Sequence, residues 1–165
     1  MCIRDRRAAA KRNPNCLWAV ANNTNLPFAR GTIDIITSLF GFPTWQAWTQ
    51  LQIVGQRVLV VDAGVDHLIE LREKLYKTVR KHAAPTHEKA VAAGYQIIRE
   101  QACQYTGQLT SAQLLLPLAQ MTPHAYRSDR ERLDQLAQLG TKDKASTTSM
   151  TIDLVIREYE KTNDT

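Results

Sequence analysis

The chain has 165 residues, a length that fits one domain built around one hydrophobic core. Hydrophobic residues make up 44% of the sequence, which is ordinary for a soluble globular protein. No stretch approaches the roughly 18 consecutive apolar residues that a membrane-spanning helix needs. The formal net charge of +5 is compatible with a polyanionic partner such as RNA, but it does not require one.

The amino-terminal residues are charged, and no apolar segment follows them that would serve as a secretory signal. The three cysteines, Cys2, Cys16 and Cys103, are scattered, a pattern that argues against a disulfide framework and against a zinc site within this chain. We therefore expect a cytoplasmic protein that does not associate with a membrane. Residues 1–6 read like a translated sequencing adapter, so residues 1–7 are interpreted as a non-native extension.

The first elements alternate helical and extended patterns. Residues 8–12 are predicted to end a helix, and the apolar run at 16–21 is predicted to be a buried strand. The β-branched run at 32–39 predicts a second strand. Pro43 fits the first turn of the helix that follows. Residues 57–61 are almost continuously apolar, which is typical of a parallel strand covered on both faces.

The second half of the chain continues this alternation. An amphipathic helix is predicted between Asp66, as its N-cap, and Pro85, which stops it. Because strands alternate with helices, the sequence predicts an α/β sheet with parallel crossovers. The later elements are a strand at 95–105, a helix at 110–118, a helix at 128–140 that opens on a capping-box pattern, and a strand at 149–159.

In doubly wound sheets, ligands bind beyond the carboxyl ends of the strands. Three segments leave predicted strands at that edge, namely residues 22–25, 40–43 and 62–67. Asn22 and Asn23 offer amide groups that could bond the edge of an adenine. The same two residues are also typical of a plain turn, because Asn tolerates the left-handed conformation. No Ser-His-Asp set, metal cluster or P-loop is recognisable in the sequence.

Other side chains with possible chemical roles have two interpretations each. His67 either donates a hydrogen bond to a ligand or is an exposed or capping histidine. Phe40 and Phe42 flank a glycine, and they either stack a flipped base or belong to the core. Arg127 is either a phosphate contact or a sheet-edge contact. The basic side chains within 72–81 favour a solvated helix face over a phosphate-binding surface, because acidic residues are interspersed among them.

Several short motifs recur in fixed order and spacing from residue 8 almost to the end of the chain. The most specific are His67-Leu68-Ile69-Glu70-Leu71 and Met121-Thr122-Pro123-His124-Ala125-Tyr126-Arg127. The others lie at 8–14, 20–28, 34–36, 75–76 and 82–85. Taken together, these motifs resemble the bacterial 23S rRNA (guanine-N1)-methyltransferases, the RlmA-like family.

The resemblance implies an α/β fold, the Rossmann-like sheet of a class I methyltransferase that depends on S-adenosylmethionine (SAM), with antiparallel late strands. Residues 8–165 then correspond to the carboxyl-terminal part of that domain. We expect the sheet to be truncated at the N-terminus, because the first strand and the glycine-rich SAM loop of the family are missing. The family's amino-terminal zinc module is missing too, so zinc is expected only in a longer parent protein.

The resemblance also implies roles for individual residues. His67 matches a family histidine that contacts SAM, and Asn22 and Asn23 stand where the family meets the adenine. Phe40 and Phe42 lie where the family has Tyr-Ala-Pro at its substrate loop. This departure changes the loop but keeps an aromatic ring at Phe40.

The parent protein is expected to transfer a methyl group from SAM to N1 of a guanine in 23S rRNA. Its expected partner is 23S rRNA, and the sequence is compatible with either a monomer or a homodimer. Arg127 is assigned to substrate binding, while no residue is assigned to catalysis or to a metal. Two alternatives remain, a small-molecule methyltransferase of the same fold and a non-catalytic α/β fragment that exposes an apolar sheet edge.

Overall fold

The computed structural model describes residues 3–82, 84–142 and 147–163, so residues 1 and 2 of the expected extension lie outside the described residues. The strands are β1 (Ile35–Leu39), β2 (Arg57–Ala63), β3 (Tyr95–Leu109) and β4 (Thr148–Lys161). The helices are α1 (Ile3–Arg12), α2 (Trp45–Leu51), α3 (Ile69–Leu75), α4 (Glu88–Ala92), the 3-10 helix η1 (Ala112–Leu114), α5 (Leu115–Gln120), α6 (Pro123–Arg127) and α7 (Arg130–Lys142). In the described part of the chain, no helix combines the length and the apolar character needed to cross a membrane.

The four strands form one sheet in the order β1-β2-β4-β3. β1 and β2 run parallel and are connected through α2. β4 lies between β2 and β3 and runs antiparallel to both. The parallel crossover and the antiparallel late strands expected from the sequence are therefore confirmed. β2, β3 and β4 also lie where the apolar patterns predict strands.

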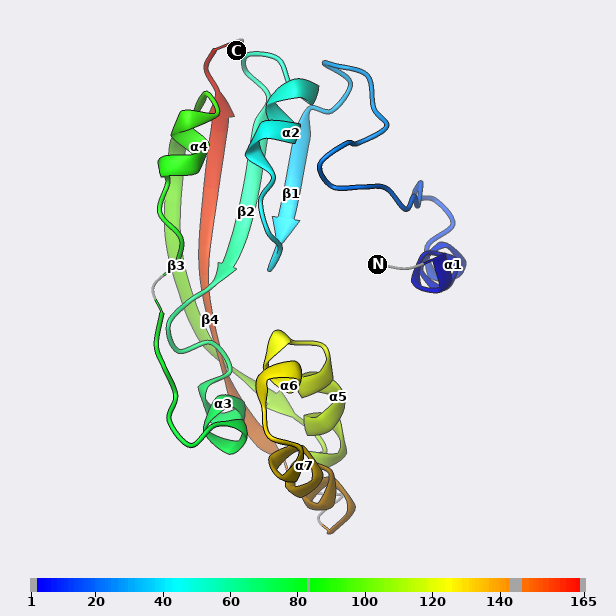
Figure 1. Ribbon diagram of the computed structural model, residues 1–165, viewed down its shortest axis with the longest axis vertical. Coiled ribbons are helices and arrows are strands. Elements are labelled where there is room, and N and C mark those ends of the chain that lie inside the picture. Colours follow the sequence, from blue (N-terminus) through cyan, green and yellow to red (C-terminus); the bar gives the residue numbers. More distant parts are fainter. Residues whose placement is uncertain (1–2, 83, 143–146, 164–165) are drawn as a thin grey trace.

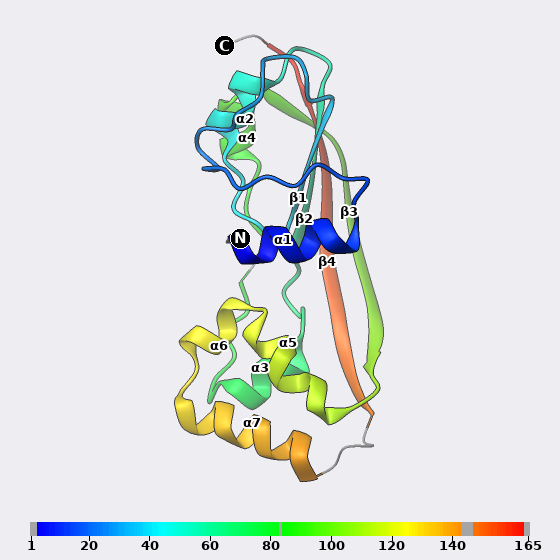
Figure 2. The same cartoon turned by 90° about the vertical axis from the view of Figure 1, so that its right-hand side faces the viewer.

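The molecule is elongated along β3 and β4, which have 15 and 14 residues (Figure 1). α2 and α4 lie beside one half of the sheet, and α3 and α5 to α7 lie beside the other half. Figure 2 shows that these helices lie on one side of the sheet. Two clusters of buried residues result, one formed by Ala47, Trp48, Val58, Val60, Ala90, Ala93, Tyr95 and Tyr159. The other contains Leu68, Leu71, Leu75, Ala112, Leu115, Ala119, Leu136 and Met150.

The opposite face of the sheet is bare in the described structure. Along β2, Val58 and Val60 are buried, whereas Leu59, on the other face, is only half-buried. Ile35 and Leu39 of the edge strand β1 share that other face, and each is 62% exposed. The expectation that the apolar run of β2 is covered on both faces is therefore wrong for the described residues. The apolar residues of the bare face still suit burial, because water contact with apolar surface is unfavourable.

The amino-terminal segment differs most from its predicted structure. The predicted buried strand at 16–21 is an irregular stretch, and Leu17 within it is 89% exposed. α1 ends at Arg12, as predicted, and stands away from the sheet beyond β1 (Figure 1). A strand needs a neighbouring strand to satisfy its backbone groups, and none of the described strands pairs with 16–21. The apolar pattern alone therefore does not produce a strand here.

The helix expected between Asp66 and Pro85 is much shorter than its pattern. α3 begins after Leu68, which has a left-handed φ of 51°, and Tyr76 already has extended backbone angles. The Arg72 side chain explains the early end, because it donates to the carbonyl oxygens of Val65 and Arg80, at 2.8 and 2.7 Å. These bonds fold the chain after α3 back against the helix instead of extending it.

The remaining helices deviate in smaller ways. Pro43 precedes the N-cap of α2 instead of lying in its first turn. The helix predicted at 110–118 is divided into η1 and α5, because Ser111 caps a tight first turn by accepting from the Gln113 N–H at 3.2 Å. Gly140 does not end α7, which continues to Lys142. A glycine inside a helix costs only about 1 kcal/mol relative to alanine, so the rest of a helix can override it.

Candidate functional site

The carboxyl end of β1 turns sharply at Phe40. Phe40 has a positive φ of 50°, which is uncommon outside glycine, and its N–H donates to the Val61 carbonyl at 2.8 Å. The bond keeps this turn beside the end of β2. The Phe40 side chain is 56% exposed, and its ring centroid lies 5.2 Å from that of His67. The aromatic loop after β1 therefore meets the loop after β2.

The loop after β2 is fastened to β4 by its backbone. The Gly64 N–H donates to the Asp153 carbonyl at 2.8 Å, and the Asp66 N–H donates to the Asp153 carboxylate at 2.9 Å. The Leu68 N–H donates to the Thr151 carbonyl at 2.7 Å. A Cβ atom at Gly64 would clash with the Asp153 carboxyl group, so glycine lets this group lie against the loop without a shift. These contacts fix the position of the segment that carries His67.

Glu70 and Asp66 add side-chain ties to the same loop. The two carboxylate oxygens of Glu70 accept from the Thr151 N–H at 2.8 Å and from the Thr151 hydroxyl at 2.6 Å. Burial alone would raise the pKa of Glu70, but the bonds from Thr151 hold it below the ordinary value. Lys81 pairs with Asp66 at 2.6 Å. The Glu70 of the His-Leu-Ile-Glu-Leu motif therefore joins α3 to β4.

The His67 imidazole has an unsatisfied nitrogen. Its Nδ1 atom is buried and has no hydrogen-bond partner among the described residues. Burial lowers the pKa of His67, although interactions with Asp153 oppose the shift, so the ring is neutral near neutral pH. Buried polar atoms are nearly always paired in native proteins, and an unpaired one suits a bond to a ligand. The arrangement fits the expected role of His67 toward a cofactor.

The segment 22–25 forms a small turn against the aromatic loop. The Asn22 side-chain oxygen accepts from the Thr24 N–H at 3.0 Å and from its hydroxyl at 2.9 Å, the bonds typical of a turn. The Asn23 side-chain amide donates to the Phe42 carbonyl at 3.4 Å. The Thr44 hydroxyl donates to the Asn23 carbonyl at 3.1 Å. Asn23 thus links this turn to the loop between β1 and α2.

The structure brings together most of the residues that the sequence singles out. Asn23 contacts the loop of Phe42, and Phe40 in the same loop contacts His67. Arg127 is not part of this group. It lies on α6 and lines a separate cavity beneath the segment that follows α3. The sequence motifs do not show that Arg127 lies apart from the contact between Phe40 and His67, because motifs carry no information on distances in the fold.

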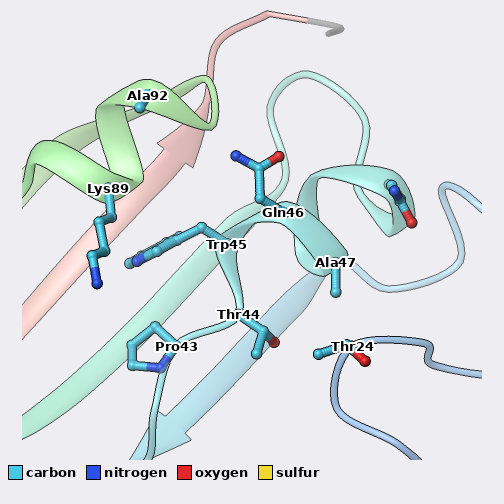
Figure 3. Close-up of a pocket in the computed structure, with 9 residues that line it drawn as sticks. Thr24, Pro43, Thr44, Trp45, Gln46, Ala47, Lys89 and Ala92 are labelled. Carbon is cyan, nitrogen blue, oxygen red and sulfur yellow. The ribbon is translucent and has the colours of Figure 1, made fainter.

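A cavity of about 430 Å³ lies beside this site, between α2, α4 and the 22–25 turn (Figure 3). Figure 3 shows Lys89 of α4 and the Trp45 indole on one side and Thr24 on the other. Trp45 is not among the site residues that the sequence predicts. Its place directly after the aromatic loop was the available signal. The lining residues are Thr24, Pro43, Thr44, Trp45, Gln46, Ala47, Gln50, Lys89 and Ala92.

An ion-pair network centred on the buried Arg157 crosses the sheet near the end of β2, and sequence analysis missed it. Arg157, only 7% exposed at its side chain, contacts Asp62 at 3.0 Å and Glu100 at 2.6 Å. His87 lies 3.4 Å from Glu100. Burial raises the pKa of Asp62, and Arg157 opposes that shift. Arg157 thus holds the Asp62 carboxylate in an ion pair at this end of β2. Among the described residues, no group of three His, Cys, Asp or Glu side chains could hold a metal ion.

Comparisons with solved structures identify the architecture. The chain is similar to a protein of Bacillus halodurans described as "a putative methyltransferase (BH2331)", with a TM-score of 0.58, 11% identity, and coverage of 99% of this chain and 81% of the other. It is also similar to the YcgJ protein of Bacillus subtilis, with a TM-score of 0.52, 15% identity, and coverage of 95% and 76%. The fold is that of a class I methyltransferase. The Rossmann-like fold class expected from the motifs is thereby confirmed.

The sequence comparison agrees with the motif resemblance. The chain is 28% identical over 140 residues to the "Putative 23S rRNA (guanine-N(1)-)-methyltransferase YxjB" of Bacillus subtilis. The match covers 82% of this chain but only 48% of the relative, so the chain spans about half the relative's length. No protein-family model matches the chain. The resemblance to an rRNA (guanine-N1)-methyltransferase that the motifs predict is therefore confirmed.

Proposed function

We propose that the chain forms part of a SAM-dependent methyltransferase that modifies N1 of a guanine in 23S rRNA. The observation that carries the proposal is the contact of the exposed Phe40 ring with His67, whose buried Nδ1 has no partner among the described residues. The contact lies at the carboxyl ends of β1 and β2, where folds of this kind bind ligands. The similarity to the rRNA methyltransferase of Bacillus subtilis supplies the substrate class.

The residues present fit the expected cofactor in two respects. His67 offers an unsatisfied imidazole nitrogen on a loop that is fastened to β4. Asn23 donates to Phe42 through its amide nitrogen, so its side-chain oxygen is the group suited to accept from an adenine amino group. The Asn22 side chain is engaged by Thr24, so Asn22 supports the cofactor site by closing the turn that carries Asn23. When bound, SAM supplies an electrophilic methyl group.

The aromatic loop fits a nucleobase. Phe40 and Phe42 are 56% and 87% exposed, and exposed rings on either side of Gly41 can stack a base removed from its helix. Methylation at guanine N1 replaces a proton on that nitrogen, so a proton must leave. Asp62 lies near the carboxyl end of β2, but its carboxylate is paired with Arg157. No described side chain is assigned as the proton acceptor.

A small molecule is the second candidate for the methyl acceptor. The cavity beside α2 measures about 430 Å³, within the range of about 300–1,000 Å³ typical of small-ligand pockets. Pro43 and Thr44, which follow the aromatic loop directly, line this cavity, and this proximity favours a small-molecule acceptor. The rRNA proposal is preferred because the relative with sequence similarity is named as an rRNA methyltransferase.

The deciding experiment measures transfer of tritiated methyl groups by the protein expressed from the full open reading frame at its genomic locus. Unmethylated 23S rRNA and a panel of small-molecule acceptors are offered in parallel. We expect label in the rRNA, and digestion to nucleosides should place it at guanine N1. Label only in a small molecule would favour the second candidate, and no transfer to any acceptor would contradict both.

A further inference from the structure

A second cavity, of about 300 Å³, lies between α3, the segment that follows it, and α6. Three arginines and two histidines line it, and none of the described residues that line it is acidic. The full lining is Arg72, Tyr76, Thr78, Val79, Arg80, His82, His124 and Arg127. The cavity is separate from the contact between Phe40 and His67, and the proposed methyl transfer does not by itself assign it a role.

Arg72 places a buried positive charge at the base of this cavity. The residue is only 8% exposed, and its guanidinium donates to the carbonyl oxygens of Val65, His67 and Arg80 at 2.8, 3.4 and 2.7 Å. Within the described part of the chain, it makes no ion pair with a carboxylate. Carbonyl oxygens satisfy its N–H groups but do not neutralise its charge. An anion bound in the cavity would supply that missing charge.

Tyr76 and His124 form a polar pair in the cavity. The Tyr76 hydroxyl lies 2.9 Å from His124 Nδ1, and the two rings meet edge to face at 5.6 Å. Burial lowers the pKa of His124, and the charges of Arg72 and Arg127 lower it further. When the phenol donates to Nδ1, the neutral ring carries its proton on Nε2 and is a hydrogen-bond donor there. The cavity is therefore electropositive and rich in donors.

The Met-Thr-Pro-His motif explains why this arrangement is held in place. The Thr122 hydroxyl caps α6 by accepting from the His124 N–H at 3.3 Å and also donates to the Ala119 carbonyl at 2.8 Å. The Ser128 hydroxyl donates to the His124 carbonyl at 2.6 Å. These bonds fix the five-residue helix α6, which carries both His124 and Arg127. The motif thus builds one wall of the cavity.

We propose that this cavity binds a phosphate group of the RNA backbone. Arg80 and Arg127 are exposed and belong to two different segments, so both can contact one bound phosphate. The buried Arg72 adds a third positive charge to the cavity lining. The inference rests on the proposed function, because it takes RNA to be the substrate. Arg72 also donates to the His67 carbonyl, so one side chain connects the cavity to the proposed cofactor site. A phosphate here would position the RNA relative to the aromatic loop.

The test measures binding of a fluorescein-labelled, unmethylated 23S rRNA hairpin to the 165-residue chain by anisotropy, over a series of KCl concentrations from about 50 to 200 mM. The variants are Arg80→Gln and Arg127→Gln. The matched control is Lys77→Gln, which removes one positive charge from the same segment at an exposed position outside the cavity lining. Thermal unfolding of each variant checks that the fold is intact.

We expect each arginine variant to weaken binding about tenfold and to reduce the slope of log K against log salt by about 0.7–0.9, the value for one lost phosphate contact. Lys77→Gln should change the affinity and the salt slope less than either arginine variant does. An effect of Lys77→Gln equal to those of the arginine variants would overturn the proposal, because binding would then follow net charge alone. Absence of RNA binding by the wild-type chain would also overturn it. Methyl transfer by the full reading frame tests the proposed function separately, so the two failures are distinguishable.

Discussion

The ring of His67, on the loop after β2, lies 5.2 Å from the ring of Phe40, on the loop after β1, at an interplanar angle of 34°. The two loops are adjacent because their strands pair in parallel, with Leu39 beside Val61. His67 Nδ1 is nevertheless left without a hydrogen bond among the described residues. Under the proposed function, we interpret this buried, unsatisfied nitrogen as a group that bonds the ligand.

Replacing His67 by alanine should affect ligand binding more than folding. We expect the protein from the full reading frame to lose about tenfold in affinity for S-adenosylhomocysteine, because one hydrogen bond from a buried group contributes about 1–1.5 kcal/mol. Calorimetric titration measures the affinity. His82→Ala, at an exposed position, is the control and should retain it. Unchanged affinity in His67→Ala would remove His67 from the cofactor site.

Gly64→Ala should destabilise the loop that carries His67. The added Cβ would lie 2.3 Å from the Asp153 carboxyl group, so this carboxyl group or the loop must move. We expect a loss of about 1–3 kcal/mol in the free energy of unfolding, measured by urea denaturation. Gly107→Ala is the control, because its Cβ would meet Ile152 at an ordinary 3.5 Å. Equal effects of the two substitutions would show that the Gly64 contact is not special.

The bond between Glu70 and Thr151 should make stability depend on pH. Because the folded-state pKa of Glu70 is below 4.5, its contribution is fully present above pH 4.5 and is lost as the pH falls through the lowered value. Glu70→Gln should therefore be less stable than the wild type at about pH 7, and the difference should shrink at about pH 3. Urea denaturation at both pH values measures this. A difference that stays constant with pH would argue against the bond.

Arg157 and Asp62 should show strong coupling. Arg157→Met leaves the Asp62 carboxylate, 13% exposed at its side chain, without its cation, so we expect a loss of about 3–5 kcal/mol in the free energy of unfolding. Combining it with Asp62→Asn removes the stranded charge and should recover part of the loss. Urea denaturation of the wild type, both single variants and the double variant gives the coupling energy. Strict additivity would mean that the two groups do not stabilise each other.

The bare face and free edge of β1 should make the isolated chain prone to self-association. Ile35 and Leu39 are each 62% exposed on an edge strand, which can template pairing with another copy. Replacing both by threonine keeps strand propensity and should raise the soluble, monomeric fraction in light scattering after gel filtration. Val91→Thr, an exposed change on α4, is the control. No difference between the two proteins would place the association elsewhere.

Local patterns in the sequence determined the strands β2 and β4 and the amphipathic start of α3, because alternating or continuous apolar residues report burial directly. The same reasoning failed at 16–21, since a strand also needs a partner, and no described strand pairs with it. It failed at the end of α3 because Arg72 bonds carbonyl groups on both sides of the helix.

The sequence by itself thus determined the class of the fold and the motifs that carry the resemblance. Only the tertiary structure decided which of those motifs meet. It joined His67 to Phe40 at one edge of the sheet and placed Arg127 with Arg72 in a different cavity. The reason is physical: hydrophobic periodicity and chemical type are properties of single segments. The distance between side chains depends on strand pairing and on buried polar bonds such as those of Asp153 and Arg72.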